Sequence, residues 1–424
     1  MSKLKVKNFG PITTGFTEND GFMDFRKVTV FIGNQGSGKS SVAKLFSTMS
    51  WLEKALFQGR VTQDYVTKYN RFVKEYCAYQ NLKNYFRDDT VIEYRGRAYT
   101  LIYRDRKLEV YEILRLSGMK TPEYKVPQIM YVPAERNFLS AVDEPDKLKG
   151  LPKSLVTFWE ELRQAQRELP ADFLLPIGNV RFTFDKSNKI SRLVGQTAGN
   201  VPYRLRLSEA SSGFQSFVPL LLVSRYLAGS ISREHDASRS ELSGEVLQKL
   251  RVRIAQILAD DKLSLEVQQQ ALEALSSQFR NEVFFNIVEE PEQNLFPKSQ
   301  QVILYQLLEF ANATPGNELV LTTHSPYIIN YLTLAIKAHE VKRVINISKQ
   351  NDKLQRRLAE IVPDNAAVIA EDVVVYELSE TGKISLLPMY DGLPSDDNDL
   401  NEALGATNAR FSDLLEIEQY AQQG

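Results

Sequence analysis

The segment Gly33–Ser40 (GNQGSGKS) constrains this chain more than any other part of the sequence. It fits the phosphate-binding loop pattern G-x-x-x-x-G-K-[ST] at every fixed position, and in that pattern glycines bring backbone N–H groups close to an anionic oxygen. Lys39 can reach the β- and γ-phosphates of a nucleotide, and the Ser40 hydroxyl can join the oxygen shell of Mg²⁺. The predicted nucleotide cradle is the whole loop: Gly33, Asn34, Gln35, Gly36, Ser37, Gly38, Lys39 and Ser40.

The sequence on both sides of this loop supports the same interpretation. Residues 27–32 (KVTVFI) are typical of a buried strand, and residues 40–49 predict a helix whose positive N-terminal end would face the phosphates. A glycine-rich turn without a ligand is the alternative, and it requires neither flank. The segment therefore predicts an α/β fold of the P-loop NTPase kind, with ATP and Mg²⁺ as cofactors.

Composition and the lack of targeting patterns indicate the cellular compartment in which the chain is expected to fold. The chain has 424 residues, a formal net charge of −1 and 43% hydrophobic residues, so we expect a large core and no bulk basic field. Cys77 is the only cysteine, which leaves no disulfide framework and suits a reducing cytosol. The N-terminus lacks a signal-peptide pattern, and no run of 18 uncharged apolar residues occurs. We expect a cytoplasmic protein without a membrane span.

Periodicity divides the rest of the chain. We expect a helical segment at 51–87, whose many Tyr and Phe residues form either a packing face or a base-stacking platform, and a β-meander at 91–115. A charged helix, short strands and a long apolar helix follow at 153–169, 179–206 and 208–228, before a polar helical insertion at 230–280. Strands are expected at 283–288, 319–323 and 373–378, with helices at 298–311 and 325–334 between them and a terminal helix near 408–420. This alternation implies a mainly parallel sheet covered by helices.

A pair of carboxylates follows an apolar strand in FFNIVEE, residues 284–290. We expect Glu289 to hold Mg²⁺ through its water shell and Glu290 to polarise the attacking water as general base. Adjacent strand residues point to opposite faces, so Glu290 has to lie on the loop just past the strand, and Pro291 supports that ending. A chance acidic strand end is the alternative.

Two further segments fit a nucleotide site. His324 follows another apolar strand in LVLTTHSPYII and is predicted to contact the γ-phosphate and the attacking water, although a lone histidine is also a common structural residue. Serines and a glycine open the helix in LSEASSGFQSF, and a helix start of this composition forms an anion site or an ordinary N-cap. The residues of this second segment are Ser211, Ser212, Gly213 and Gln215.

Taken in order, these segments resemble the ABC-type ATPase heads of the SMC, Rad50, RecF and OLD class. The sequence SSGFQ at 211–215 is similar to the ABC signature, EEPE at 289–292 to the Walker B motif, NLFP at 294–297 to the D-loop, and THS at 323–325 to the switch histidine. The resemblance implies one ATPase head over residues 1–424, with a mostly parallel core sheet, an antiparallel β-lobe, helical insertions at 51–87 and 230–280, and an acidic loop and C-terminal helix at 391–424.

The chain departs from the class at three positions. Glu289 replaces the usual Asp, Gln35 replaces the usual Asn of the phosphate loop, and Phe296 replaces the D-loop His or Asp. A Q-loop glutamine is also hard to place, because Gln128 precedes its strand and Glu135–Arg136 occupy the loop after it. These departures affect the expected rate of hydrolysis more than nucleotide binding.

The resemblance also implies partners. In this class the signature completes the ATP site of a second subunit, so homo-oligomers are expected. The chain has no long heptad segment and only 100 residues after His324, too few for a Toprim domain. It therefore resembles compact ATPases that act with a separate nuclease in bacterial anti-phage systems, such as the AriA family of PARIS, whose partner is a Toprim-type nuclease and whose trigger is phage-encoded; the Septu-type PtuA family is the alternative. A RecF- or Rad50-like ATPase that binds DNA is the other function considered, and the near-neutral charge disfavours it.

The acidic loop is the one other cluster of carboxylates outside the expected site. Serine, glycine and proline between its acidic residues indicate an exposed turn, so a solvated loop, a partner-docking surface and a metal site remain the three interpretations. We expect the chain alone to cut neither DNA nor RNA. The acidic residues of the loop are Asp391, Asp396, Asp397, Asp399 and Glu402.

Overall fold

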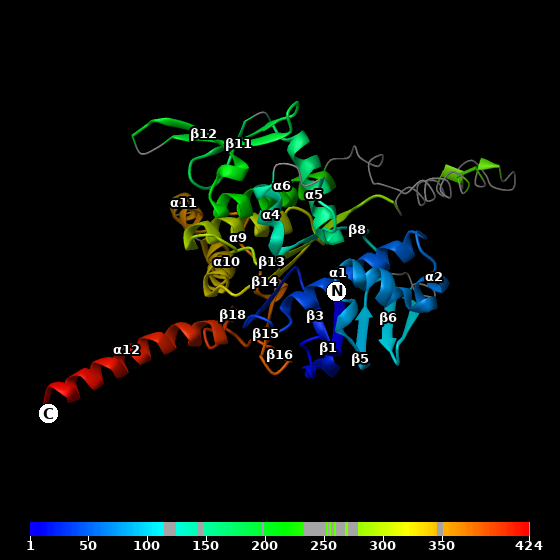
Figure 1. Ribbon diagram of the computed structural model, residues 1–424, viewed down its shortest axis with the longest axis horizontal. Helices are drawn as coiled ribbons and strands as arrows, with labels where there is room; N and C mark the ends of the chain where they lie inside the picture. Colours follow the sequence, from blue (N-terminus) through cyan, green and yellow to red (C-terminus); the bar gives the residue numbers. More distant parts are fainter. Residues whose placement is uncertain are drawn as a thin grey trace.

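A computed structural model shows three larger sheets, the helices that cover them and a two-stranded sheet of β17 Met389–Tyr390 and β18 Leu393–Pro394 (Figure 1). It describes residues 1–113, 124–142, 147–170, 172–196, 199–232, 279–345 and 351–423, together with seven residues between 252 and 269. Most of the insertion expected at 230–280 lies outside the described residues.

The central sheet has seven strands in the order β2-β16-β15-β4-β14-β13-β8. Its neighbours from β15 to β8 are parallel, whereas β16 runs antiparallel to β15, so the expected mainly parallel sheet is confirmed. The strands span β2 Gly15–Phe16, β4 Val28–Gly33, β8 Pro127–Val132, β13 Val283–Glu289, β14 Glu318–Thr322, β15 Val373–Leu378 and β16 Lys383–Leu386.

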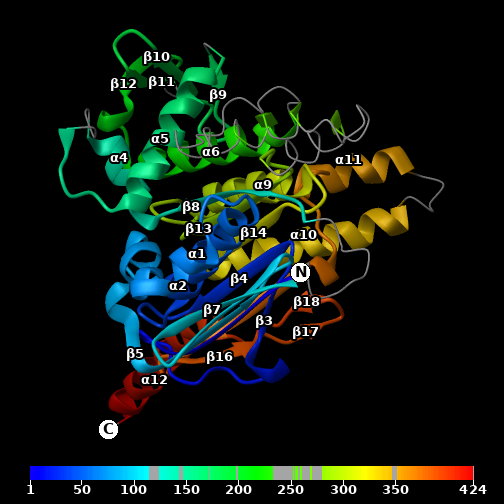
Figure 2. The same cartoon turned by 90° about the vertical axis from the view of Figure 1, so that its right-hand side faces the viewer.

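Side-chain alternation along β4 explains why both faces of this sheet are covered. Val28, Val30 and Ile32 belong to the core under one layer of helices, whereas Phe31 belongs to the core on the other face. The first layer comprises α5 Lys153–Glu168, α6 Ser212–Ser232, α9 Pro297–Asn312 and α10 Pro326–Ile345, and the other face carries α1 Lys39–Phe57. α11 Asn351–Ile361 lies beside α10 (Figure 2).

An antiparallel β-lobe packs over α1. Its order is β3-β1-β5-β6-β7, and the expected meander supplies β5 Phe86–Arg95, β6 Tyr99–Arg104 and β7 Lys107–Glu112, beside β1 Ser2–Phe9 and β3 Met23–Phe25. Glu53 of α1 ties the two together, because its buried carboxylate accepts hydrogen bonds from the Tyr94 hydroxyl and the Ala98 N–H, both at 2.7 Å. Burial raises the pKa of Glu53.

A second antiparallel sheet lies at the opposite end of the molecule, above α6 (Figure 1). Its order is β12-β11-β10-β9, with β9 Phe173–Leu174, β10 Arg181–Asp185, β11 Ile190–Gln196 and β12 Pro202–Arg206. The chain leaves β12 through a short helix, Leu207–Glu209, and enters α6 at Ser212. The expected short strands at 179–206 are therefore present.

Three boundaries differ from the sequence expectation. α1 runs to Phe57, so the first part of 51–87 continues the phosphate-loop helix, and α2 Gln63–Thr67 and short turns follow it. α10 extends well past Leu334 to Ile345. α12 Asp399–Gln423 begins before residue 408, because Asn398 Oδ1 accepts the Asn401 N–H at 3.1 Å and caps an earlier start.

Among the described residues, α6 is the one helix long and apolar enough to cross a bilayer. Its apolar window is 61% buried inside the molecule, and Val218, Leu221 and Leu222 belong to the main core. α6 is accordingly a core helix that packs on α5, α9 and β13.

Candidate nucleotide site

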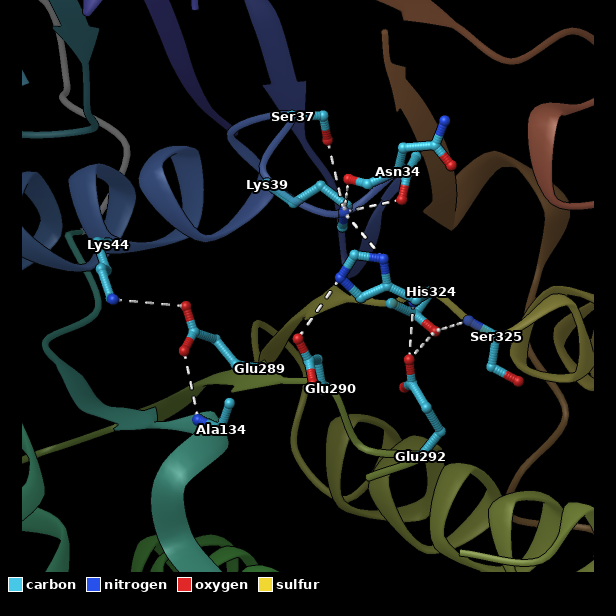
Figure 3. Close-up of polar contacts among 12 residues, drawn as sticks. Asn34, Ser37, Lys39, Lys44, Ala134, Glu289, Glu290, Glu292, His324 and Ser325 are labelled. Carbon is cyan, nitrogen blue, oxygen red and sulfur yellow. Dashed lines mark hydrogen bonds and ion pairs between the residues drawn. The ribbon is translucent and has the colours of Figure 1, made fainter. Parts of the chain in front are cut away.

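The order of the strands in the central sheet brings the residues of this site together. β14 lies between β4 and β13, and all three are parallel, so their carboxyl ends meet at one edge of the sheet. The phosphate loop follows β4, the paired carboxylates end β13, and His324 follows β14. Ligands of open α/β sheets bind outside the carboxyl ends of the strands, where these three segments converge (Figure 3).

Two glycines shape the phosphate loop. Gly33 ends β4 at a φ of 133°, and a Cβ there would lie 2.2 Å from the Leu378 carbonyl oxygen of β15. Gly38 has a φ of 106° at the N-cap of α1, and its carbonyl accepts the Val42 N–H at 3.1 Å. Side chains are strained in both conformations, so this close backbone curve requires glycine.

Lys39 spans the loop and is 4% exposed. Its ammonium donates to the Gly33 and Asn34 carbonyl oxygens at 2.8 and 2.7 Å, and its Nζ lies 3.4 Å from His324 Nδ1. Burial lowers the pKa of Lys39 to about 8, against the opposing effect of Glu290 and Glu292. The structure thus places a cation among the loop carbonyls, next to the histidine of a neighbouring strand.

Glu290 lies on the loop directly after β13, as the sequence predicts. It adopts a φ of 43°, an unusual value for a glutamate, and its N–H donates to the Thr322 carbonyl at 2.9 Å. Its Oε1 lies 3.5 Å from His324 Nε2, and the interaction with this imidazole is the main cause that lowers its pKa. Glu290 is therefore an ionised carboxylate, in the state that a general base requires.

Glu289 points to a different set of partners. Its Oε2 accepts the Ala134 N–H at 3.3 Å, its Oε1 lies 3.8 Å from Lys44 Nζ, and the side chain is 4% exposed. Oε1 is buried without a hydrogen-bond partner. A buried carboxylate oxygen in that state, on the same strand end as Glu290, suits the water shell of Mg²⁺ better than a closed hydrogen-bond network does.

Glu292 is a site residue that the sequence analysis did not single out. Its Oε1 accepts the Thr323 hydroxyl at 2.8 Å and the His324 N–H at 2.7 Å, so it fixes the start of the histidine loop. Burial raises its pKa. Glu292 is the last letter of EEPE, and the motif was the only available signal for it.

Arg136 was also missed as a functional residue. It is fully buried, and its guanidinium donates to four backbone carbonyls: Ser216 at 3.2 Å, Pro133 at 3.3 Å, Glu289 at 2.7 Å and Glu290 at 2.6 Å. These bonds connect the loop after β8 with the end of β13 and with α6. Burial lowers the pKa of Arg136 to about 10, well above neutrality, so the group stays charged.

The predicted signature lies on the first turn of α6, and it packs on the loop that follows the carboxylates. A Cβ on Gly213 would lie 3.0 Å from the Asn294 carbonyl oxygen, and Ser216 Oγ lies 3.3 Å from Gln293 Oε1. Gln215 turns back and donates to the Ser208 and Ala210 carbonyls, both at 3.0 Å. Ser211 and Ser212 are exposed.

In the described parts of the chain, no hydrogen bond joins this first turn to the phosphate loop of the same chain. The loop instead gathers Lys39, Glu290 and His324 without the signature. Phe296, which replaces the D-loop His or Asp, is 75% exposed at the same surface.

A proline explains a contact between α6 and the loop after β8. Pro219 lacks an N–H, so the Gln215 carbonyl loses its helical donor. The Ser140 hydroxyl of α4 Phe138–Ala141 donates to that carbonyl at 2.9 Å. Together with Arg136, this bond docks the segment after β8 on the signature helix, in the place where the sequence offers no Q-loop glutamine.

Neither a protein family nor a curated protein matches this chain. Solved structures do. It is similar to an SMC head bound to the C-terminal winged-helix domain of ScpA (13% identity, 78% of this chain, 90% of that chain, TM-score 0.28). It is also similar to the SMC head domain from Thermotoga maritima (11% identity, 92% of this chain, 98% of that chain, TM-score 0.29). A third similar structure is the dimeric bacterial ABC transporter cassette MJ0796 (11% identity, 92% of this chain, 100% of that chain, TM-score 0.23).

The fold is that of a P-loop NTPase, with a mostly parallel core sheet, helices on both faces and an antiparallel β-lobe. This assignment rests on the phosphate loop after β4, the parallel order β4-β14-β13-β8 and the β-lobe over α1. The α/β P-loop fold class expected from the sequence is confirmed.

Proposed function

We propose that this protein binds and hydrolyses ATP with Mg²⁺ at a site that two copies of the chain complete. The observation that carries the proposal is the convergence of three strand ends on His324, whose imidazole lies 3.4 Å from Lys39 Nζ on one side and 3.5 Å from Glu290 Oε1 on the other. Lys39 would bind the phosphates, Glu290 would accept a proton from the attacking water, and His324 would link the water to the γ-phosphate. The proposed nucleotide-binding residues are all those of Gly33–Ser40.

Mg²⁺ would be held by Ser40 and Glu289. Ser40 is half-buried near the start of α1, and Glu289 offers the unpartnered oxygen described above. Hydroxyl, carboxylate and water oxygens are the ligands that Mg²⁺ prefers. The extra methylene of Glu289 relative to aspartate increases the reach of its carboxylate, so the geometry around Mg²⁺ would differ from that of an aspartate site.

The proposed second half of the site is the first turn of α6, with Ser211, Ser212, Gly213 and Gln215. This helix start is exposed and unlinked by hydrogen bonds to its own phosphate loop, so it is available to the nucleotide of another copy. Backbone N–H groups at a helix start favour an anion. ATP would then hold two copies together as a homo-oligomer.

Lys39→Ala tests nucleotide binding directly. Titration calorimetry with ATP and Mg²⁺ should show loss of tight binding, because the cation at the phosphates is gone. Lys3→Ala, a surface change in the β-lobe, is the matched control and should bind normally. Unchanged affinity in a folded Lys39→Ala protein would overturn the phosphate-loop assignment.

Ser212→Arg tests action between subunits. The variant should bind ATP as a monomer yet fail to hydrolyse it, because the long side chain occupies the place of a partner's γ-phosphate. Mixed with Lys39→Ala subunits it should recover part of the ATPase activity, since some interfaces then combine two intact halves. Absence of recovery in oligomers shown to contain both variants would mean that the signature does not act in trans.

We further propose that ATP-driven assembly holds and releases a separate effector protein in bacterial anti-phage defence, with a Toprim-type nuclease as the expected effector and a phage product as the expected trigger. The support is the resemblance of the motif order to the compact ATPases of that kind and the absence of a long heptad segment from the sequence. Affinity purification of the ATP-bound Glu290→Gln protein from its native host would test it. A co-purifying nuclease is expected, and a DNA-repair complex would contradict it.

The second candidate is ATP-gated DNA binding of the RecF or Rad50 kind. One observation favours it: residues 172–206, which form the β9–β12 sheet, contain six basic and two acidic residues. DNA affinity would fall steeply as salt increases. A titration with duplex DNA at two salt concentrations, with and without ATP, distinguishes the two functions.

A further inference from the structure

α12 leaves the body of the protein as a single helix (Figure 1). Its distal half carries an exposed apolar stripe. Phe411, Leu414, Leu415 and Ile417 are 62%, 62%, 44% and 64% exposed. Their spacings of three and four residues place them on one side of the helix. An apolar stripe of this size on an extended helix indicates that something covers it.

The same helix is acidic. Residues 399–424 contain five acidic residues and one basic residue, a net charge of −4. Asp413, four residues before Ile417, and Glu418, four residues after Leu414, are exposed and lie next to the stripe. Two α12 helices packed on each other would bring two charges of −4 together, which disfavours a pair of these helices as the solution.

The outer face of the β9–β12 sheet has the opposite charge. Its register places Leu174, Arg181, Val194 and Arg204 opposite one another across the four strands, with Arg192 and Arg206 paired in a neighbouring row. The alternate residues Phe182 and Leu193 are buried against the core, so the arginine rows face outward. Leu174 is 58% exposed, and residues 172–206 have a net charge of +4.

Each surface adjoins a different half of the proposed ATP site. α12 contacts β4, the phosphate-loop strand, and the Asp399 N–H donates to Glu377 of β15 at 2.8 Å. The β9–β12 sheet leads directly into the signature turn at Ser212. Within one chain the two surfaces lie at opposite ends of the molecule (Figures 1 and 2), so α12 does not reach this sheet in its own chain.

We propose that α12 of one copy docks on the outer face of the β9–β12 sheet of a second copy. The inference rests on the proposed two-copy ATP site, in which the phosphate loop of one chain meets the signature of the other. In that arrangement the root of α12 and the partner's basic sheet lie on adjoining parts of one interface. Apolar residues of the stripe pack against Leu174 and Val194, while Asp413 and Glu418 face Arg181 and Arg204.

Disulfide trapping tests the contact. Tagged chains carrying Leu414→Cys are mixed with untagged chains carrying Leu174→Cys, with and without ATP, in a Glu290→Gln background that retains the nucleotide. The native Cys77 is buried, so it should not interfere. A tagged–untagged disulfide dimer is expected, and Val344→Cys on α10, where the side chain is 70% exposed against 62% for Leu414, should give none with Leu174→Cys.

Charge reversal supplies an independent readout. The double change Asp413→Lys with Glu418→Lys should weaken the ATP-bound dimer about tenfold by sedimentation, since two ion pairs become repulsive. Arg181→Glu with Arg204→Glu should weaken it similarly, and mixing the two double variants should restore the affinity. ATP binding by the separate monomers should not change.

The outcomes separate this inference from the proposed function. An ATP-dependent dimer with no disulfide between the cysteines introduced at positions 414 and 174 overturns the docking of α12 and leaves the two-copy site intact. A disulfide that forms equally without ATP, in a protein whose Ser212→Arg variant still hydrolyses ATP, supports the docking and overturns the two-copy site. A disulfide between two cysteines at position 414 contradicts the docking. So does a result in which the arginine variants lose DNA affinity but form the dimer normally.

Discussion

The imidazole of His324 lies 3.5 Å from the Glu290 carboxylate, measured from Nε2 to Oε1. Its other nitrogen lies 3.4 Å from Lys39 Nζ, so the histidine stands between the proposed base and the phosphate-binding lysine. This position follows from the strand order, because β14 separates β4 from β13. A side chain at the end of the middle strand is the natural link between groups on the two outer strands.

ATP affinity should fall as pH rises above about 8. Burial lowers the pKa of Lys39 to about 8, so below this pH the ammonium is charged before ATP binds. Above it the neutral amine must take up a proton on binding, and the affinity should drop by up to about tenfold per pH unit. Fluorescent-ATP titrations between pH 7 and 9 measure the slope. Lys39→Arg keeps its charge throughout this range, so its affinity, even if weaker, should be flat; a similar slope in that variant would assign the effect to another group.

Glu290→Gln should retain ATP binding and lose about 10²–10⁴-fold in hydrolysis rate, because the amide keeps the shape and cannot accept the proton. Single-turnover hydrolysis and equilibrium binding of ATP, measured on the same protein, separate the two effects. Glu289→Gln is the comparison: its loss should be relieved in part by raising the Mg²⁺ concentration. If Glu289→Gln abolished hydrolysis at every Mg²⁺ concentration while Glu290→Gln did not, the two roles would be exchanged.

Local pattern accounts for much of this fold. The apolar run before Gly33, the carboxylates after residues 284–288 and the histidine after residues 319–323 each mark a strand end, and all three strands are present. The local sequence pattern does not reveal which strands are neighbours in the sheet. Placing β14 between β4 and β13 depends on contacts between segments nearly 300 residues apart, and only the resemblance of the motif order hinted at it.

The residues missed in the site act on backbone atoms. Arg136 bonds to carbonyls in two distant segments, α6 and the end of β13, and Glu292 bonds to a hydroxyl and a backbone N–H one strand away. A carbonyl is present at every position, so no residue type at the other end marks the contact. The early start of α12 depends partly on a contact of the same kind, because the Asp399 N–H donates to Glu377 of β15; its cap, Asn398, is a local signal that the sequence did contain.

Arg136→Met should destabilise the protein by roughly 2–4 kcal/mol, because it leaves buried carbonyls of Pro133, Ser216, Glu289 and Glu290 without their donor. Urea denaturation with matched slopes measures the change. Arg204→Met, on the exposed face of β12, should stay within about 0.5 kcal/mol of the parent protein. An unchanged free energy of unfolding in Arg136→Met would show that water replaces these hydrogen bonds. The connection between β13 and α6 through Arg136 would then not stabilise the fold.

The purified chain alone should cut neither DNA nor RNA, because the carboxylates at the end of β13 are committed to ATP and Mg²⁺ in the proposed mechanism. The acidic loop is the alternative metal site. Its main-chain polar groups are used locally: the Asp397 N–H donates to Ser395 Oγ at 3.0 Å, and the Asp396 carbonyl accepts from Asn401 Nδ2 at 2.9 Å. The side chains of Asp391, Asp396 and Asp397 are exposed, and within the part of the chain that the structure describes no three His, Cys, Asp or Glu side chains are grouped to hold a metal.

Incubation with plasmid DNA and tRNA in the presence of ATP and either Mg²⁺ or Mn²⁺ measures this directly. Intact substrates are expected, and the same should hold for the Glu290→Gln protein, which excludes cleavage driven by ATP hydrolysis. The informative control is the double variant Asp396→Ala with Asp397→Ala. Cleavage by the parent chain that disappears in this variant while ATP hydrolysis continues would make the chain its own effector. The acidic loop would then be a metal site, and the role of a scaffold for a separate nuclease would be wrong.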